Sequence, residues 1–109
     1  MKEKDLQRQV IDLAHALGWQ VCHFRTARML SGTWATPVHA EGAGWPDLFM
    51  VHPGQQRAVA AELKSERGRL SEDQIKWIAN LRLCHVEAYV WRPDDAEQIM
   101  HILSKGGET

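Results

Sequence analysis

The chain has 109 residues, a mass of 12.4 kDa, 44% hydrophobic residues and a formal net charge of −1. This length allows one modest hydrophobic core, so residues 1–109 are predicted to form a single domain. No apolar run reaches membrane-spanning length and no signal-peptide pattern opens the chain, so we expect a soluble, cytoplasmic protein. The two cysteines are too few for a disulfide scaffold, and their spacing is not that of a metal site.

Residues 2–17 have the periodicity of an amphipathic helix, and Gly18 is expected to end it. The apolar stripe of this helix consists of Leu6, Val10, Leu13, Ala14 and Leu17. Extended backwards, the stripe meets Glu3 and Gln7, two polar side chains at positions where core residues would be expected. Glu3 either turns inward to complete a metal site or only favours the positive end of the helix dipole.

The segment after this helix divides into a strand and a long irregular stretch. Residues 19–26 alternate, with Val21, His23 and Arg25 on one face, which predicts the strand. A lone histidine such as His23 is more typical of half-buried structure than of a ligand. Residues 27–44 have no sustained period. Such a long loop is usually functional or disordered, and because it leads directly into the next strand we expect it to flank the functional site.

Two apolar stretches, 44–51 and 58–64, are joined by a short polar turn and are predicted to be strands. Side chains alternate along a strand, so Glu62 and Lys64 share one face of the second stretch. If the two strands are antiparallel neighbours, Asp47 lies across from the end of the second strand, within reach of Glu62. Two carboxylates would then converge beside a lysine.

This arrangement is the one that a hard divalent cation such as Mg²⁺ requires, with waters and a substrate phosphate completing its coordination. The backbone carbonyl of Glu62 or Leu63, or a further acid, could add a ligand. Lys64 could hold an attacking water or neutralise charge that develops on a phosphate. The hairpin therefore predicts a metal-assisted phosphoester site.

The C-terminal part of the chain is predicted to form a helix, a strand and a second helix. Ser71 and Gln74 have the spacing of a capping box, so a helix should begin there and run to Cys84. Gln74 is either a structural cap or a side chain that reaches the site, and the two roles are compatible. Residues 86–91 form the last predicted strand, which Pro93 stops before the closing helix.

The pair Pro46-Asp47, followed fifteen positions later by Glu62-Leu63-Lys64, resembles the signature of the PD-(D/E)XK nuclease superfamily. Later segments resemble the VRR-NUC family, including its small stand-alone phage and prophage members, and the similarity extends from Glu3 to Leu103. These segments are Gly68-Arg69-Leu70-Ser71, Gln74, Trp77, Leu81 and Val90-Trp91-Arg92-Pro93.

The resemblance implies an α/β fold in a single domain, with a restriction-endonuclease-like αβββαβ core, a mixed central sheet flanked by helices, and a C-terminal helix. It also implies a DNA endonuclease that depends on Mg²⁺ or Mn²⁺, acts on branched or Holliday-junction-like DNA in repair or recombination, and works as a homodimer in a bacterial or phage-infected cell. The site residues that it implies are Glu3, Asp47, Glu62, Lys64 and Gln74.

The net charge of −1 is unfavourable for a DNA-binding protein, because affinity for duplex DNA comes largely from Lys and Arg contacts to phosphates. Local charge matters more than the sum, and several candidate DNA contacts fall near the predicted site: Arg25, Arg28, Arg67, Arg69 and Trp34. The arginines could equally form a solvated surface, and Trp34 could pin its loop to the core. His39 and Glu41 are conceivable auxiliary ligands.

Two other functions remain open at this point. The first is a DNA-binding module that keeps the fold but has lost cleavage, although a binder has no need of converging carboxylates. The second is a small α/β interaction protein in which Glu62 and Lys64 form a surface ion pair. Stabilisation by Mn²⁺ would separate this second alternative from the nuclease, because a surface pair should not respond to the metal.

Overall fold

The computed structural model describes residues 1–24, 27–28, 30–32, 34–35 and 38–105, with only the backbone described at 27–28, 34–35 and 105. Within these residues the helices are α1 (Glu3–Ala16), α2 (Glu72–Leu83) and α3 (Ala96–Lys105), with 3-10 turns η1 (Pro53–Gln55) and η2 (Pro93–Asp95). The main sheet contains β1 (Gln20–His23), β4 (Leu48–His52), β5 (Arg57–Leu63) and β6 (Glu87–Trp91).

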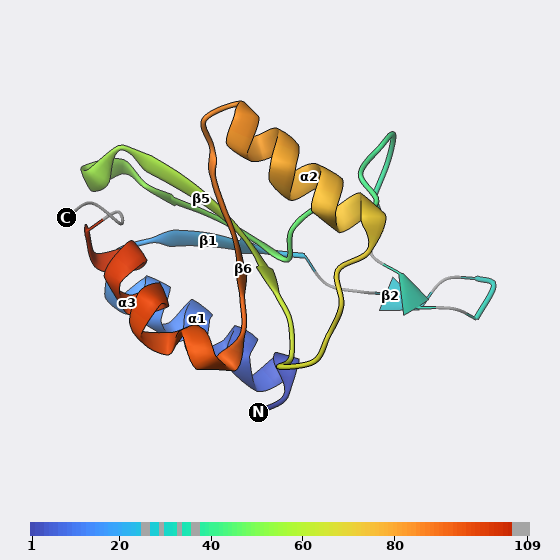
Figure 1. Cartoon of the computed structure of the whole chain (residues 1–109), viewed down its shortest axis with the longest axis horizontal. Helices are drawn as coiled ribbons and strands as arrows, with labels where there is room; N and C mark the ends of the chain where they lie inside the picture. Colours follow the sequence, from blue (N-terminus) through green and yellow to red (C-terminus); the bar gives the residue numbers. More distant parts are fainter. Residues whose placement is uncertain (25–26, 29, 33, 36–37, 106–109) are drawn as a thin grey trace.

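The main sheet is mixed, as predicted, with strand order β1-β4-β5-β6 (Figure 1). β4 pairs antiparallel with both β1 and β5, and β5 pairs parallel with β6. A parallel pair needs a crossover connection, and α2 provides it between β5 and β6. The predicted α/β architecture with an additional C-terminal helix is therefore confirmed.

The helices cover the two faces of the sheet, with α1 and α3 on one face and α2 on the other (Figure 1). The alternation of β5 decides which residues meet which helix. Val59 and Leu63 are fully buried in the larger core with residues of α1 and α3, whereas Ala60 packs with Ile78 of α2 in a smaller core. The predicted division of β5 between two faces is correct.

The stretch predicted to be irregular contains a short second sheet. β2 (Ala27–Arg28) and β3 (Trp34–Ala35) pair antiparallel over two residues each. Strands of two residues are too short to produce a detectable alternation, which is why the sequence pattern does not predict them. The strand predicted over residues 19–26 is observed as Gln20–His23. Residues 25–26 of the predicted strand lie outside the described ranges.

The predicted end of α1 is also confirmed. Leu6, Val10 and Ala14 are buried along one stripe, and Gly18 follows with φ of 92°. This left-handed conformation is accessible to glycine at little cost, and it lets Trp19 N–H bond back to the Ala14 carbonyl at 2.9 Å. None of the helices in the described ranges is long and apolar enough to cross a bilayer.

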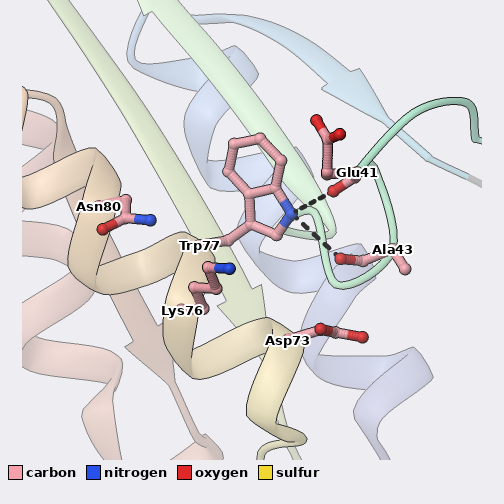
Figure 2. Close-up of a pocket in the computed structure, with 6 residues that line it drawn as sticks. All are labelled: Glu41, Ala43, Asp73, Lys76, Trp77 and Asn80. Atoms are coloured by element: carbon pink, nitrogen blue, oxygen red, sulfur yellow. Dashed lines mark hydrogen bonds between the residues drawn. The ribbon is translucent and has the colours of Figure 1, made fainter.

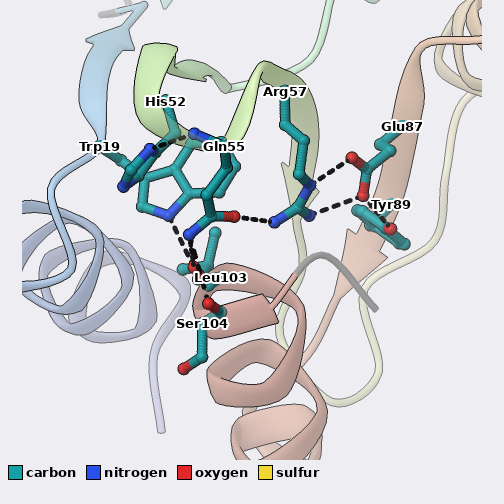
Figure 3. Close-up of polar contacts among 8 residues, drawn as sticks. All are labelled: Trp19, His52, Gln55, Arg57, Glu87, Tyr89, Leu103 and Ser104. Atoms are coloured by element: carbon teal, nitrogen blue, oxygen red, sulfur yellow. Dashed lines mark hydrogen bonds and ion pairs between the residues drawn. The ribbon is translucent and has the colours of Figure 1, made fainter. Parts of the chain in front are cut away.

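A polar network ties the β4–β5 turn to β6, at the end of β5 opposite Lys64 (Figure 3). Arg57 donates two hydrogen bonds of 2.7 Å to the Glu87 carboxylate and one of 2.6 Å to Gln55 Oε1, and its guanidinium lies over the Trp19 ring at 5.0 Å. Burial raises the pKa of Glu87, but hydrogen bonds from Arg57 and Tyr89 outweigh this and lower it overall. Glu87 therefore stays ionised and anchors β6 to β5.

We expect Arg57→Ala to lower the free energy of unfolding by about 1–2 kcal/mol, because it removes charge-assisted hydrogen bonds from a partly exposed pair and leaves Glu87 without its cation. Urea unfolding followed by circular dichroism would measure the change. Arg67→Ala, which removes an exposed arginine from the loop after Lys64, is the matched control. Equal unfolding midpoints for the two variants would show that the network does not stabilise the fold.

Candidate active site

The β4–β5 pairing brings Asp47 and Glu62 together as the sequence predicts. Leu48 is paired with Ala61, so Asp47 lies one residue further on, across from Glu62. Asp47 Oδ2 accepts a 2.9 Å hydrogen bond from the Leu63 N–H, and the Asp47 carbonyl accepts one of 3.1 Å from Phe24 N–H. Neighbouring backbone on both sides therefore holds Asp47 in place.

Glu62 is the one buried charged residue in the described part of the chain, with 2% of its surface exposed. Its Oε2 accepts a 2.9 Å hydrogen bond from Gln74 Nε2 and lies 3.7 Å from Lys64 Nζ. Its other oxygen, Oε1, is buried and has no hydrogen-bond partner. A buried acceptor without a partner is costly for folding, so it marks a position where an additional group is expected to bind.

Burial raises the pKa of Glu62 to about 8, and the negative charge of Asp47 adds to this shift while Lys64 opposes it. A protonated Glu62 can also donate a hydrogen bond to Asp47, which favours the neutral form further. Near neutral pH the two carboxylates therefore retain a proton in the absence of a bound cation.

Gln74 makes both a capping contact and a contact with Glu62. Its backbone N–H donates to Ser71 Oγ at 3.1 Å, and its side-chain Oε1 accepts from the Ser71 N–H at 2.9 Å, which completes the capping box of α2. The amide nitrogen is left free to donate to Glu62 Oε2. One side chain thus fixes the start of α2 and the orientation of Glu62.

The start of α1 lies near the same carboxylates. Burial raises the pKa of Glu3, and the charge of Asp47 adds to the shift. One turn along the helix, Gln7 Nε2 is hydrogen-bonded to Nε2 of the half-buried His23 on β1. In the described ranges, however, no three Asp, Glu, His or Cys side chains form a group that could hold a metal ion. Glu3 is therefore close enough to affect Asp47 electrostatically but does not complete a three-carboxylate set.

The structure describes only some of the predicted DNA contacts. Arg67 and Arg69 are exposed in the loop that leads from Lys64 to α2. Arg25 lies outside the described residues, and for Arg28 and Trp34 only the backbone is described.

Arg92 supports the loop after Lys64, a role that the sequence does not reveal. Its Nη1 donates to the carbonyls of Ser65 and Gly68 at 2.7 and 2.8 Å. In the sequence, Arg92 is only part of a segment that resembles the VRR-NUC family. Nothing local in the sequence indicates a contact between residues 27 positions apart.

Trp77 is a second residue whose role was not predicted, and it connects α2 to the segment before Asp47 (Figure 2). Its indole N–H donates to the carbonyls of Glu41 and Ala43, each at 3.0 Å. An open cavity of about 480 Å³ lies beside it. Glu41, considered above as an auxiliary metal ligand, lines this cavity and belongs to no metal-binding group in the described part of the chain.

Comparison with protein families gives one match, which covers most of the chain. The sequence profile of the VRR-NUC domain matches residues 20–95, from β1 to η2, including Asp47, Glu62, Lys64 and Gln74 but not Glu3. A comparison with curated proteins found no match, and a comparison with solved structures also found none. Because the family match covers well over half of the residues, the chain belongs to the VRR-NUC family of PD-(D/E)XK-type nuclease domains.

Proposed function

We propose that the protein is a divalent-metal-dependent DNA endonuclease in which Asp47 and Glu62 hold Mg²⁺ or Mn²⁺. The observation that carries this proposal is the buried Glu62 Oε1, which has no hydrogen-bond partner and lies beside a second carboxylate. A hard cation between the two groups would satisfy this oxygen and offset their repulsion. Membership of a nuclease family supports DNA as the substrate.

The remaining ligands would come from outside the pair of carboxylates. Since the described residues contain no group of three metal-binding side chains, we propose that waters and the backbone carbonyl of Leu63 complete the coordination. Glu3 would contribute through a bound water. This incomplete protein shell is usual for Mg²⁺, which keeps several waters and takes substrate phosphate oxygens as ligands.

The side chains around the carboxylates would divide the chemistry between them. When bound, a divalent cation stabilises negative charge on the phosphate oxygens and helps to generate the attacking hydroxide. Lys64, whose Nζ lies 3.7 Å from Glu62 Oε2, would orient the water and stabilise developing charge. Gln74 would keep Glu62 aimed at the phosphate through the 2.9 Å hydrogen bond to Oε2.

We also propose the preferred DNA structure, the phosphate contacts and the oligomeric state. Branched, Holliday-junction-like DNA would be the substrate in repair or recombination of a phage or bacterial genome, with exposed Arg67 and Arg69 contacting phosphates. One small domain carries one site, so symmetrical cutting of two strands would require a homodimer.

Cleavage of labelled four-way junction, splayed-arm and linear duplex DNA in Mn²⁺, Mg²⁺ or EDTA would test the proposal. We expect cutting in either metal, none in EDTA, and the fastest cutting on the four-way junction. Light scattering of the protein with uncleaved junction should show two copies per junction. Binding of all three substrates without cutting in any metal would instead identify an inactive DNA-binding module.

A further inference from the structure

One side of α2 borders an open cavity that the proposed cleavage chemistry does not use (Figure 2). Its volume is about 480 Å³, within the usual range of small-molecule sites. The lining consists of Glu41, Ala43, Asp73, Lys76, Trp77 and Asn80. It is thus formed partly by α2 and partly by the loop that leads to Asp47.

The cavity is held open by fixed contacts between these two parts. The Trp77 indole N–H bonds to two carbonyls of the loop, at Glu41 and Ala43. Gly44, with φ of 85°, packs so closely on the first turn of α2 that a Cβ atom there would lie 2.6 Å from the backbone carbon of Asp73. A preformed cavity binds a ligand without the cost of ordering its walls.

The groups around the cavity indicate which kind of ligand it fits. Trp77 is a half-buried aromatic ring, and the amide of Asn80 can both donate and accept hydrogen bonds. Two carboxylates, of Glu41 and Asp73, and one cation, Lys76, border the same space, so its net charge is negative and would disfavour a phosphate. The suitable ligand is therefore flat, aromatic and uncharged, with donors and acceptors along its edge. An unpaired nucleobase has these properties.

A second cavity borders Trp77 on its apolar side and extends the aromatic surface there. Its volume is about 400 Å³, and its lining includes Phe24 and Trp45. The rings of Trp45 and Trp77 meet edge to face with centroids 5.0 Å apart, so Trp45 supports the Trp77 ring from the core side. A ring held in this way provides a rigid stacking surface, which is how proteins bind bases of unpaired strands.

The cavity also lies at a suitable distance from the candidate active site. Gln74, which bonds Glu62, precedes Trp77 and Asn80 by three and six residues on the same helix. A helix rises about 1.5 Å per residue, so these side chains start about 4.5 and 9 Å further along α2. Stacked nucleotides of one strand are about 3.4 Å apart, so this separation along the direction of α2 corresponds to about one to three nucleotides.

We propose that this cavity binds one unpaired DNA base, stacked on Trp77 and hydrogen-bonded by Asn80, one to three nucleotides from the cleaved phosphate. The inference rests on the proposed nuclease function and adds a substrate feature to it. The enzyme would recognise a base that is already unpaired, as in the arms of splayed-arm DNA, or one that opens from its duplex at the branch point of a junction, and would thereby place the neighbouring phosphate at Glu62.

The test uses splayed-arm DNA in which each nucleotide near the branch point is replaced in turn by an abasic residue. Binding is measured in EDTA at fixed salt, and cleavage of the same DNA is measured in Mn²⁺. With the wild type we expect binding to weaken about tenfold for an abasic residue at one or two adjacent positions, and little elsewhere. Asn80→Ala should reduce this penalty, whereas Gln98→Ala, an exposed amide on α3 outside the cavity, should preserve it.

The outcomes separate this inference from the nuclease assignment. Cleavage with a penalty that does not depend on abasic position would overturn the base site and leave the nuclease intact. A position-dependent penalty without cleavage in any metal would support the base site in an inactive binder. An abasic penalty that is the same at every position, together with weaker binding and a shallower salt dependence of Lys76→Ala, would indicate a phosphate contact in the cavity and overturn the base site. Absence of DNA binding would overturn both proposals.

Discussion

Replacement of Lys64 by alanine is expected to reduce the single-turnover cleavage rate about 10²–10³-fold while DNA binding weakens much less. Lys64 follows the last residue of β5, and its Nζ lies 3.7 Å from Glu62 Oε2, so in the proposed mechanism its charge would lie beside the reacting phosphate. An interaction that strengthens only as charge develops contributes to the rate more than to affinity. Rapid-quench cleavage and fluorescence-anisotropy binding on the same labelled substrate would measure the two quantities.

Two further variants define the role of Lys64. Lys4→Ala removes an exposed lysine from α1 and should cleave at the wild-type rate, whereas Lys64→Arg keeps the charge and should recover part of the lost rate. Lys64 also lowers the pKa of Glu62, so Lys64→Ala should shift the pH dependence of cleavage to higher pH. If affinity and rate fell by the same factor, Lys64 would be a phosphate-binding residue without a specific role in the reaction.

Glu62→Gln is expected to stabilise the metal-free protein above neutral pH, even though it removes a candidate metal ligand. Burial raises the pKa of Glu62 to about 8 in the folded state, from its ordinary value of 4.5. Between these two pH values the folded state holds a proton that the unfolded state has lost, so wild-type stability falls as pH rises from about 4.5 to about 8. Glutamine cannot ionise, so this decrease should be absent from the variant.

The size of the effect follows from the contacts of Glu62. The new amide can still accept from Gln74 and can donate toward Asp47, where the ionised wild type has an unpartnered buried oxygen. We expect a gain of about 1–3 kcal/mol at pH 8, the usual cost of one unsatisfied buried group. Denaturant unfolding at several pH values in EDTA would measure it. Glu97→Gln, an exposed acid on α3, serves as the control and should leave the pH dependence unchanged.

Addition of Mn²⁺ should reverse the order of the two proteins. A cation held by the carboxylate pair, as proposed, would replace its proton, so the wild type should release a proton on binding and gain about 2.7 kcal/mol of stability when Mn²⁺ is at 100 times its dissociation constant. Glu62→Gln should show neither response. Calorimetric titration in buffers of different ionisation enthalpy would count the released protons. Equal stabilisation of both proteins by Mn²⁺ would place the metal at another site.

The sequence alone was sufficient for the parts of the fold that depend on local periodicity. Alternation along residues 58–64 and the short turn before them determined that Asp47 and Glu62 would meet, because an antiparallel hairpin with a short turn has few possible registers. The spacing of Ser71 and Gln74 likewise determined the start of α2, since a capping box is satisfied within four consecutive residues.

Only the tertiary structure decided the surroundings of this pair of carboxylates. Glu62 is buried, has one oxygen without a hydrogen-bond partner and is bonded by Gln74 of α2, and no local pattern in the sequence indicates these surroundings. The contacts of Trp77 with Glu41 and of Arg92 with Ser65 join residues 36 and 27 positions apart. Periodicity determines which face a side chain takes, but its partner depends on how whole elements pack, and that packing produced both the buried carboxylate and the cavity beside Trp77.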